Sequence, residues 1–176
     1  MLLRVIKKIL FIFFLIVAEL AFVRALGWPL YLLSPVLVAL TFVGVLDNFK
    51  RAIVYGVVFG LIIDLFSASF FGITAISFVL ALFVIDKVFN KVFTNKSLYS
   101  IVFLVIIAQI VVNYISNVFF FIQTFIFDKA VDYSLLFNLE NLKLLGYAIL
   151  VNVVLSSIIF LIFHSFSNRF KTILIR

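Results

Sequence analysis

The residues of this chain that could do chemistry are ionisable side chains placed inside apolar segments. Asp64 lies in the run GLIIDLFSASFFGITAISF, residues 60–78, and Glu19 interrupts an earlier apolar run shortly before Arg24. A charged carboxylate at mid-membrane costs about 2.5 to 3.5 kcal/mol on insertion scales, so it needs a partner, water or a proton. Two interpretations follow: a functional carboxylate, or an internal tie in which Arg24 is the counter-group of Asp64 or Glu19.

Enzymatic and metal chemistry has few residues to use here. The 176 residues include no cysteine and one histidine, His164, which leaves almost nothing for metal centres or a Ser-His-Asp triad. Asp64, Glu19 and His164 are also expected at different depths of the membrane. No glycine pattern makes a P-loop or a dinucleotide-binding fingerprint. The sequence therefore predicts no enzyme, no cofactor and no metal site.

The composition places the chain in a membrane. Hydrophobic residues make up 67% and charged residues 12%, with a mean hydropathy of +1.40, whereas soluble domains are roughly half apolar and a quarter charged. A spanning helix needs ~20 apolar residues. Apolar runs fall at about 5–23, 28–46, 52–66, 71–85, 98–127 and 144–163. We expect an all-α integral membrane protein, a single domain over residues 1–176 with six transmembrane helices.

The basic residues predict the orientation of these helices. If the N-terminus lies inside, the inside segments hold eleven of the 14 Lys and Arg and the outside segments three, as the positive-inside rule requires. Both termini are therefore predicted in the cytoplasm, and the net charge of +7 belongs to membrane faces rather than to nucleic acid. The three outside residues are Arg24, Lys129 and Lys143.

Small residues share one face of the third predicted span. Residues four apart lie on one side of a helix, which aligns Gly56, Gly60 and Asp64 with Ala52 and Ala68. The spacing GVVFG lets another backbone come close in lipid. Either another span of the same chain or the helix of a partner could occupy this face. We expect the partner's helix at Gly60 or Gly56.

Polar residues also follow the last two predicted spans. Gln109, Asn113, Asn117, Asn152 and Ser156 are typical of hydrogen bonds between helices, and could also line a small wet cavity. The outer connection between these spans, from Asp128, carries leucines at helical spacing in its part Leu135–Leu142. This part is either a short interfacial amphipathic helix or the start of the last span.

The segment around Asp64 resembles a family signature. Gly60, Asp64, the patch Ser67-Ala68-Ser69, and Gly72 followed by Ile73-Thr74-Ala75 are similar to the motif of the bacterial rod shape-determining protein MreD family. The resemblance is close over residues 56–81 and loose over the whole chain. The chain departs from the family pattern at Ala68, Phe70 and Thr74, where Gly, Pro, and Asn or His are common.

The resemblance implies a non-enzymatic subunit of the cell-elongation machinery, which synthesises peptidoglycan, in the bacterial cytoplasmic membrane. Such a subunit binds the bitopic protein MreC and, through it, the actin-like cytoskeleton and the glycosyltransferase–transpeptidase pair. The family also resembles in fold the substrate-binding subunits of energy-coupling-factor transporters. The alternative function is therefore a small-molecule-binding membrane subunit of a vitamin-type transporter.

The candidate residues serve either partner binding or structure. Beyond the single-span partner, membrane lipids and a second copy of the chain are the other partners that the sequence allows. The candidates are Gly56, Gly60, Asp64, Gly72, Glu19 and Arg24.

Overall fold

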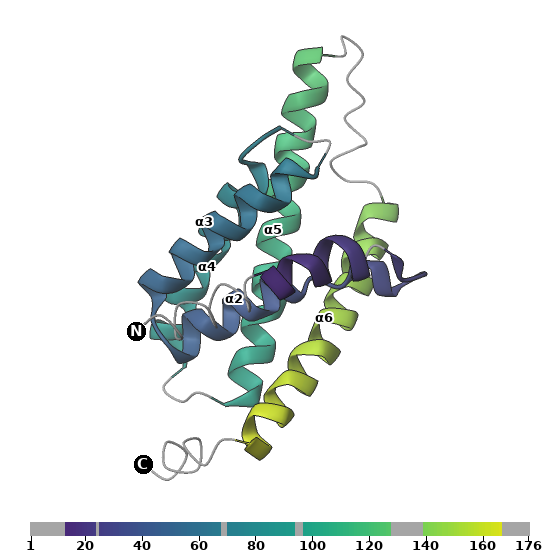
Figure 1. Ribbon diagram of the computed structural model, residues 1–176. Helices are drawn as coiled ribbons and strands as arrows, with labels where there is room; N and C mark the ends of the chain where they lie inside the picture. The colour runs from purple at the N-terminus through teal and green to yellow at the C-terminus, as the bar shows by residue number, and fades with distance from the viewer. Residues whose placement is uncertain (1–12, 24, 68–69, 94–96, 128–138, 167–176) are drawn as a thin grey trace.

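The computed structural model describes residues 13–23, 25–67, 70–93, 97–127 and 139–166, and every regular element in these ranges is a helix (Figure 1). This confirms the prediction of an all-helical fold. A helix over residues 13–23, here called the N-terminal helix, ends in the π-helical stretch η1 (Ala18–Val23). The other elements are η2 (Leu30–Leu32), α2 (Pro35–Leu46), α3 (Phe49–Leu65), α4 (Ile73–Val92), α5 (Leu98–Phe127) and α6 (Leu139–Phe166).

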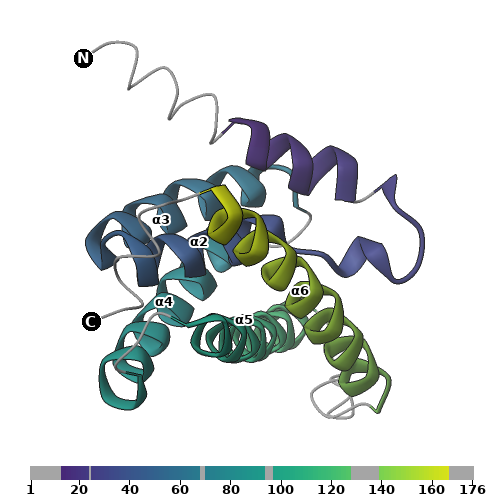
Figure 2. The same cartoon turned by 90° about the horizontal axis from the view of Figure 1, so that it is seen from below.

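The short helix α2 forms the centre of the bundle. It packs against α3, α4, α5 and α6, and Figure 2 shows the other helices arranged around it. Val36, Val38 and Leu40 are at most 1% exposed, and they join side chains of α3, α4 and α5 in one core cluster. A helix that is apolar on all sides lies in a protein core or in a membrane. The composition of α2, PVLVALTFVGVL, therefore suits its central place.

Proline divides the second predicted span. The run 28–46 is not one helix, because η2 ends at Leu32 and α2 begins at Pro35, with Ser34 between them at φ −129° and ψ 79°. A residue before proline avoids the helical region, and proline itself fits the first helical position. As a result α2 has 12 residues, or ~18 Å at 1.5 Å per residue.

The helices α3 and α4 form an antiparallel hairpin whose two ends differ in chemistry. Asn48 caps α3, its Oδ1 accepting from the Lys50 N–H at 2.9 Å. Arg51 Nη1 donates to both carboxylate oxygens of Asp47, and this hydrogen bond and the charge of Asp47 raise the pKa of Arg51. Phe49 stacks edge-on against Phe83 of α4, with ring centroids 5.4 Å apart. The basic start of α3 therefore lies beside the C-terminal half of α4, which carries Lys87 and Lys91.

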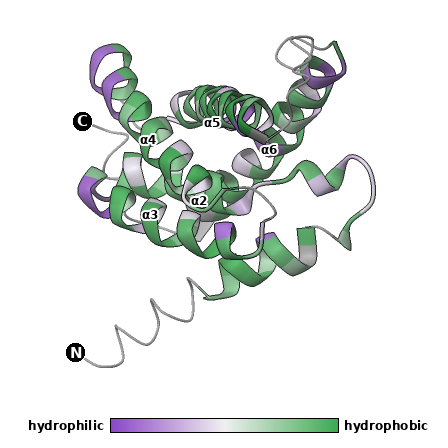
Figure 3. Cartoon of the chain, turned by 90° about the horizontal axis from the view of Figure 1, so that it is seen from above, coloured by the Kyte–Doolittle hydropathy of each residue, from purple (hydrophilic) through white to green (hydrophobic). Residues whose placement is uncertain are grey.

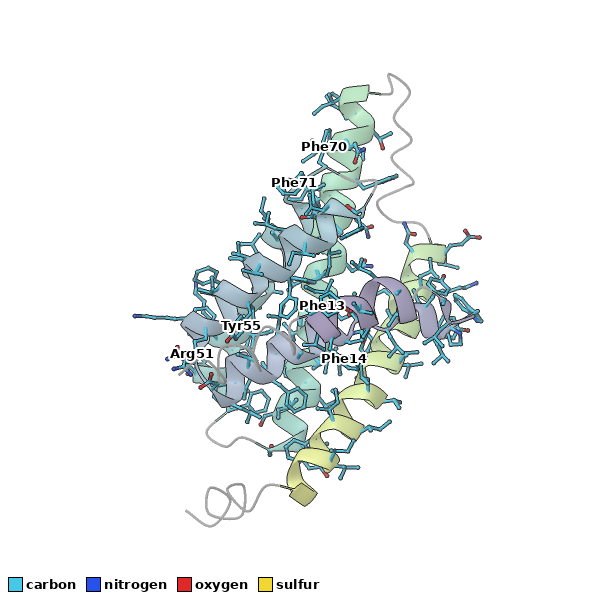
Figure 4. All side chains as sticks on the ribbon, viewed as in Figure 1. Phe13, Phe14, Arg51, Tyr55, Phe70 and Phe71 are labelled. Carbon is cyan, nitrogen blue, oxygen red and sulfur yellow. The ribbon has the colours of Figure 1, made fainter. Side chains whose placement is uncertain are left out.

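Three of the described helices are long and apolar enough to cross a membrane: Ile73–Val92, Leu98–Ile126 and Leu139–Ile162. Residues 30–46 form a shorter apolar stretch. Figure 3 shows apolar residues over most of the bundle, with hydrophilic ones at the start of α3, the end of α4 and the start of α6. In Figure 4 the exposed Phe70 and Phe71 lie at the end of the hairpin opposite Arg51. The chain is thus a membrane protein, and six spans remain a prediction.

Candidate functional site

Asp64, a residue that is 3% exposed, caps the N-terminus of α4 with its carboxylate. Its Oδ2 accepts the Gly72 N–H at 3.0 Å and the Ala75 N–H at 3.4 Å, and its Oδ1 accepts the Thr74 N–H at 3.1 Å. The first N–H groups of a helix have no partner within the helix, and the helix dipole favours a negative charge beside them. We call Asp64 and these three N–H groups the α4 cap. It provides the partner that a carboxylate in an apolar segment needs.

Gly72 allows the chain to turn into this cap. It precedes α4 in the left-handed backbone conformation, with φ +98°. A residue with a Cβ is strained at such an angle, whereas glycine is not. The Ser67 hydroxyl donates to the Asp64 carbonyl at 3.1 Å, where the connection leaves α3. Gly72, a candidate from the sequence, therefore belongs to the same structural unit as Asp64.

Gly60 is a point of close approach between α3 and α4. A Cβ built on Gly60 would overlap the Ala75 Cα and lie 2.9 Å from the Ala75 Cβ. Gly60 precedes Asp64 by one helical turn. The absence of a side chain at Gly60 therefore brings the end of α3 close enough for the short Asp64 side chain to reach the first turn of α4.

Gly56 continues the same buried face. A Cβ at Gly56 would lie 3.0 Å from the Leu82 Cδ1, 3.7 Å from the Phe78 Cβ and 3.9 Å from the Leu40 Cδ1. Phe78 and Leu82 belong to α4 and Leu40 to α2, so helices of the same chain cover this face. The expectation of a partner's helix at Gly56 and Gly60 is corrected accordingly. The packing favours the other interpretation, contact with spans of the same chain.

Glu19 does for α2 what Asp64 does for α4. It lies in the π-helical end of the N-terminal helix, where its Oε1 accepts the Ser34 hydroxyl at 3.0 Å and its Oε2 accepts the Val36 N–H at 3.1 Å. We call Glu19, Ser34 and the Val36 N–H the α2 cap. In both pairs, the N-terminal helix with α2 and α3 with α4, an acidic residue near the end of the first helix thus caps the start of the second.

Asn152 joins the α2 cap to α5 and α6. This side chain is fully buried, and its Oδ1 accepts the Ser34 N–H at 2.8 Å. Its Nδ2 donates to the carbonyls of Leu32 at 3.1 Å and Ala148 at 2.9 Å, and approaches the Gln109 Oε1 at 3.3 Å. One amide therefore holds the connection before α2 against both long helices. The polar residues Gln109 and Asn152 act here as internal hydrogen-bonding groups.

Sequence reasoning found the two carboxylates but looked for a charged partner. Arg24 lies outside the described residues, so its proposed tie to Asp64 or Glu19 stays a prediction. The partners missed were backbone N–H groups. A signal was present for both caps: each acidic residue precedes, by 16 and 9 residues, a helix start marked by Pro35 or by Gly72-Ile73.

The arrangement suits holding helices more than transforming a substrate. Both oxygens of each carboxylate accept hydrogen bonds from groups of the chain itself. In the described ranges no three His, Cys, Asp or Glu side chains gather as a metal site would need. The side chain of His164 is not among those described.

The comparison with protein-family models identifies a family. A family model described as rod shape-determining protein MreD matches residues 2–166 of the 176. No curated protein matches and no solved structure matches.

Proposed function

Because the chain belongs to the rod shape-determining protein MreD family, we propose that it is a non-enzymatic subunit of the bacterial cell-elongation machinery, which synthesises peptidoglycan. Its direct partner in this proposal is a single-span protein of the MreC type. Through that partner it would reach the actin-like cytoskeleton and the glycosyltransferase–transpeptidase pair. The family match over residues 2–166 is the observation that carries the proposal.

The geometry of the buried polar residues supports an assembly role. Glu19 and Asp64 cap helices, and Asn152 ties three segments together, so the polar groups of the interior hold the bundle in one arrangement. The alternative, a transporter subunit that binds a small molecule, relied on polar residues of α5 and α6 around a pocket. Asn152 and Ser156 are instead fully buried and hydrogen-bonded within the bundle, which favours assembly.

Cells that lose the chain are expected to lose their rod shape. If the gene is depleted in its own bacterium, the cells should widen and become round, and the intact gene should restore rods. A tagged chain should also co-purify with a single-span protein that has an external coiled coil. Unchanged shape on depletion, with no single-span protein recovered, would contradict the proposed function.

The surface for the partner's external part is proposed at the start of α6. Because helices of the same chain cover the face of Gly56 and Gly60, the segment Leu135–Leu142 is the next candidate for the surface that binds the partner. Leu139 and Leu142, its described leucines, are 68% and 69% exposed and lie three residues apart on the first turns of α6. Residues 135–138 lie outside the described ranges. Exposed leucines at the end of a helix, beyond the apolar run 144–163, offer an apolar contact to a partner.

The double substitution Leu139→Ala and Leu142→Ala is expected to reduce co-purification of the single-span partner at least tenfold, the effect of ~1.4 kcal/mol. The melting temperature of the purified chain should not change, because both side chains are exposed. Leu161→Ala is the matched control, since Leu161 is 57% exposed near the other end of α6. If the wild-type chain, the double variant and Leu161→Ala all recover the same amount of partner, the binding surface lies elsewhere.

The proposed location is the bacterial cytoplasmic membrane, with both termini on the cytoplasmic side. The basic residues of the α3–α4 hairpin lie together at one end of it, which supports this orientation. Lys50 and Arg51 begin α3, and Lys87 and Lys91 lie in the last turns of the antiparallel α4. Positive residues gather on the cytoplasmic side of membrane proteins. That end of the hairpin is therefore proposed to face the cytoplasm.

A further inference from the structure

The helices α4 and α5 lie side by side (Figure 2) and form an open groove of about 520 Å³ on the outside of the bundle. Leu80 and Phe83 of α4 and Ile110 and Tyr114 of α5 line it, each at least 43% exposed. Both helices are long and apolar enough to cross a membrane. The groove is therefore open toward acyl chains.

Among the residues that the structure describes, one charged side chain lines the groove, that of Lys87. Lys87 is five residues before the end of α4, ~7.5 Å along the helix. Lys91 follows one turn later on the same side, and both lysines are exposed. The nearby Asp86 is not part of the lining and accepts a hydrogen bond from Asn90 at 3.1 Å. The groove is thus apolar along most of its length and positively charged at one end.

We propose that this groove binds an anionic phospholipid. An acyl chain lies along Leu80, Phe83 and Ile110, and the phosphate meets the ammonium groups of Lys87 and Lys91. Lysine side chains near the end of a spanning helix extend toward the headgroup region, where anionic lipids concentrate. A partner's apolar helix in the groove would bury the Lys87 charge away from its counter-ion, which is costly in lipid. A soluble anion would leave the apolar lining unused.

The purified full chain tests the proposal by native mass spectrometry with two lipids of identical acyl chains. Dioleoyl phosphatidylglycerol is expected to bind more tightly than dioleoyl phosphatidylcholine. Lys87→Gln should lower the affinity for phosphatidylglycerol about fivefold, the equivalent of ~1 kcal/mol per basic residue near an anionic surface. Phosphatidylcholine binding should stay unchanged. Lys87→Gln with Lys91→Gln should lower the phosphatidylglycerol affinity further.

Two variants separate this site from a general surface charge. Lys50→Gln removes the same charge from the same end of the hairpin, outside the groove, and should leave phosphatidylglycerol binding unchanged. Ile110→Trp fills the groove without changing the charge and should lower the binding of both lipids, with the melting temperature retained because Ile110 is 44% exposed.

Four results would overturn the proposal. The two lipids could bind equally, or Lys50→Gln could reduce binding as much as Lys87→Gln. Free glycerol 1-phosphate could compete as well as the lipid, which would show that the acyl chain contributes nothing. A dimer of the chain that Ile110→Trp abolishes, with lipid binding intact, would assign the groove to a second copy.

Discussion

Asp64→Leu is expected to lower the free energy of unfolding by about 3 kcal/mol or more, because an unsatisfied buried polar group costs ~1 to 3 kcal/mol and three N–H groups lose their acceptor. These are the N–H groups of Gly72, Thr74 and Ala75 at the start of α4. Leucine is apolar enough for a membrane segment. The loss of stability would therefore come from the missing α4 cap and not from a poorer fit of the side chain to lipid.

Asp64→Asn should fall between the wild-type chain and Asp64→Leu. Its amide keeps one acceptor oxygen, whereas its NH₂ group faces N–H donors and cannot accept from them. Thermal unfolding of the purified chain and its abundance in the membrane measure the order. If a charge alone were required, the two variants would fail alike.

Asp47→Asn is the matched control for Asp64. Asp47 makes a surface ion pair with Arg51, and their side chains are 51% and 58% exposed. Exposed pairs contribute about 0 to 1 kcal/mol, so this variant should unfold close to the wild-type temperature. A wild-type melting temperature for Asp64→Leu would mean that the α4 cap does not stabilise the protein.

Gly60→Leu is the second substitution with a large expected effect. A first side-chain atom at Gly60 already overlaps the backbone of Ala75. Overpacking of a well-packed site costs ~1 to 3 kcal/mol, and more where the backbone must move. Separating α3 from α4 would also pull Asp64 away from its N–H partners. We expect a lower melting temperature and lower membrane abundance, and a smaller loss of the same kind for Gly60→Ala.

Glycines elsewhere in the chain provide the controls. A Cβ at Gly146, in α6, meets nothing within 4 Å, so Gly146→Ala should leave stability unchanged or raise it by up to ~1 kcal/mol through helix propensity. In the double variant Gly60→Ala with Asp64→Leu, the loss of stability should be smaller than the sum of the two single losses, because both substitutions disrupt the same contact. Full stability of Gly60→Leu together with loss of the single-span partner would restore the docking hypothesis for this face.

The sequence by itself determined the class of the protein and the position of most helices. Composition alone required a membrane, since 67% of the residues are hydrophobic. The predicted range 98–127 coincides with α5, Leu98–Phe127. The motif from Gly60 to Ala75 led to the family that the match over residues 2–166 confirms. These features are local, because hydropathy and helical spacing depend on residues that are near one another in the chain.

Only the tertiary structure decided what lies opposite each of these residues. Spacing places Gly56, Gly60 and Asp64 on one face of α3, but it does not tell a helix of the same chain from a partner's helix. The fold places Ala75 against Gly60 and the N–H groups of α4 against Asp64. Likewise Asn152 meets Ser34 across 118 positions of sequence. Such contacts depend on how helices pack in three dimensions, and a helical period carries no information about the neighbour across the interface.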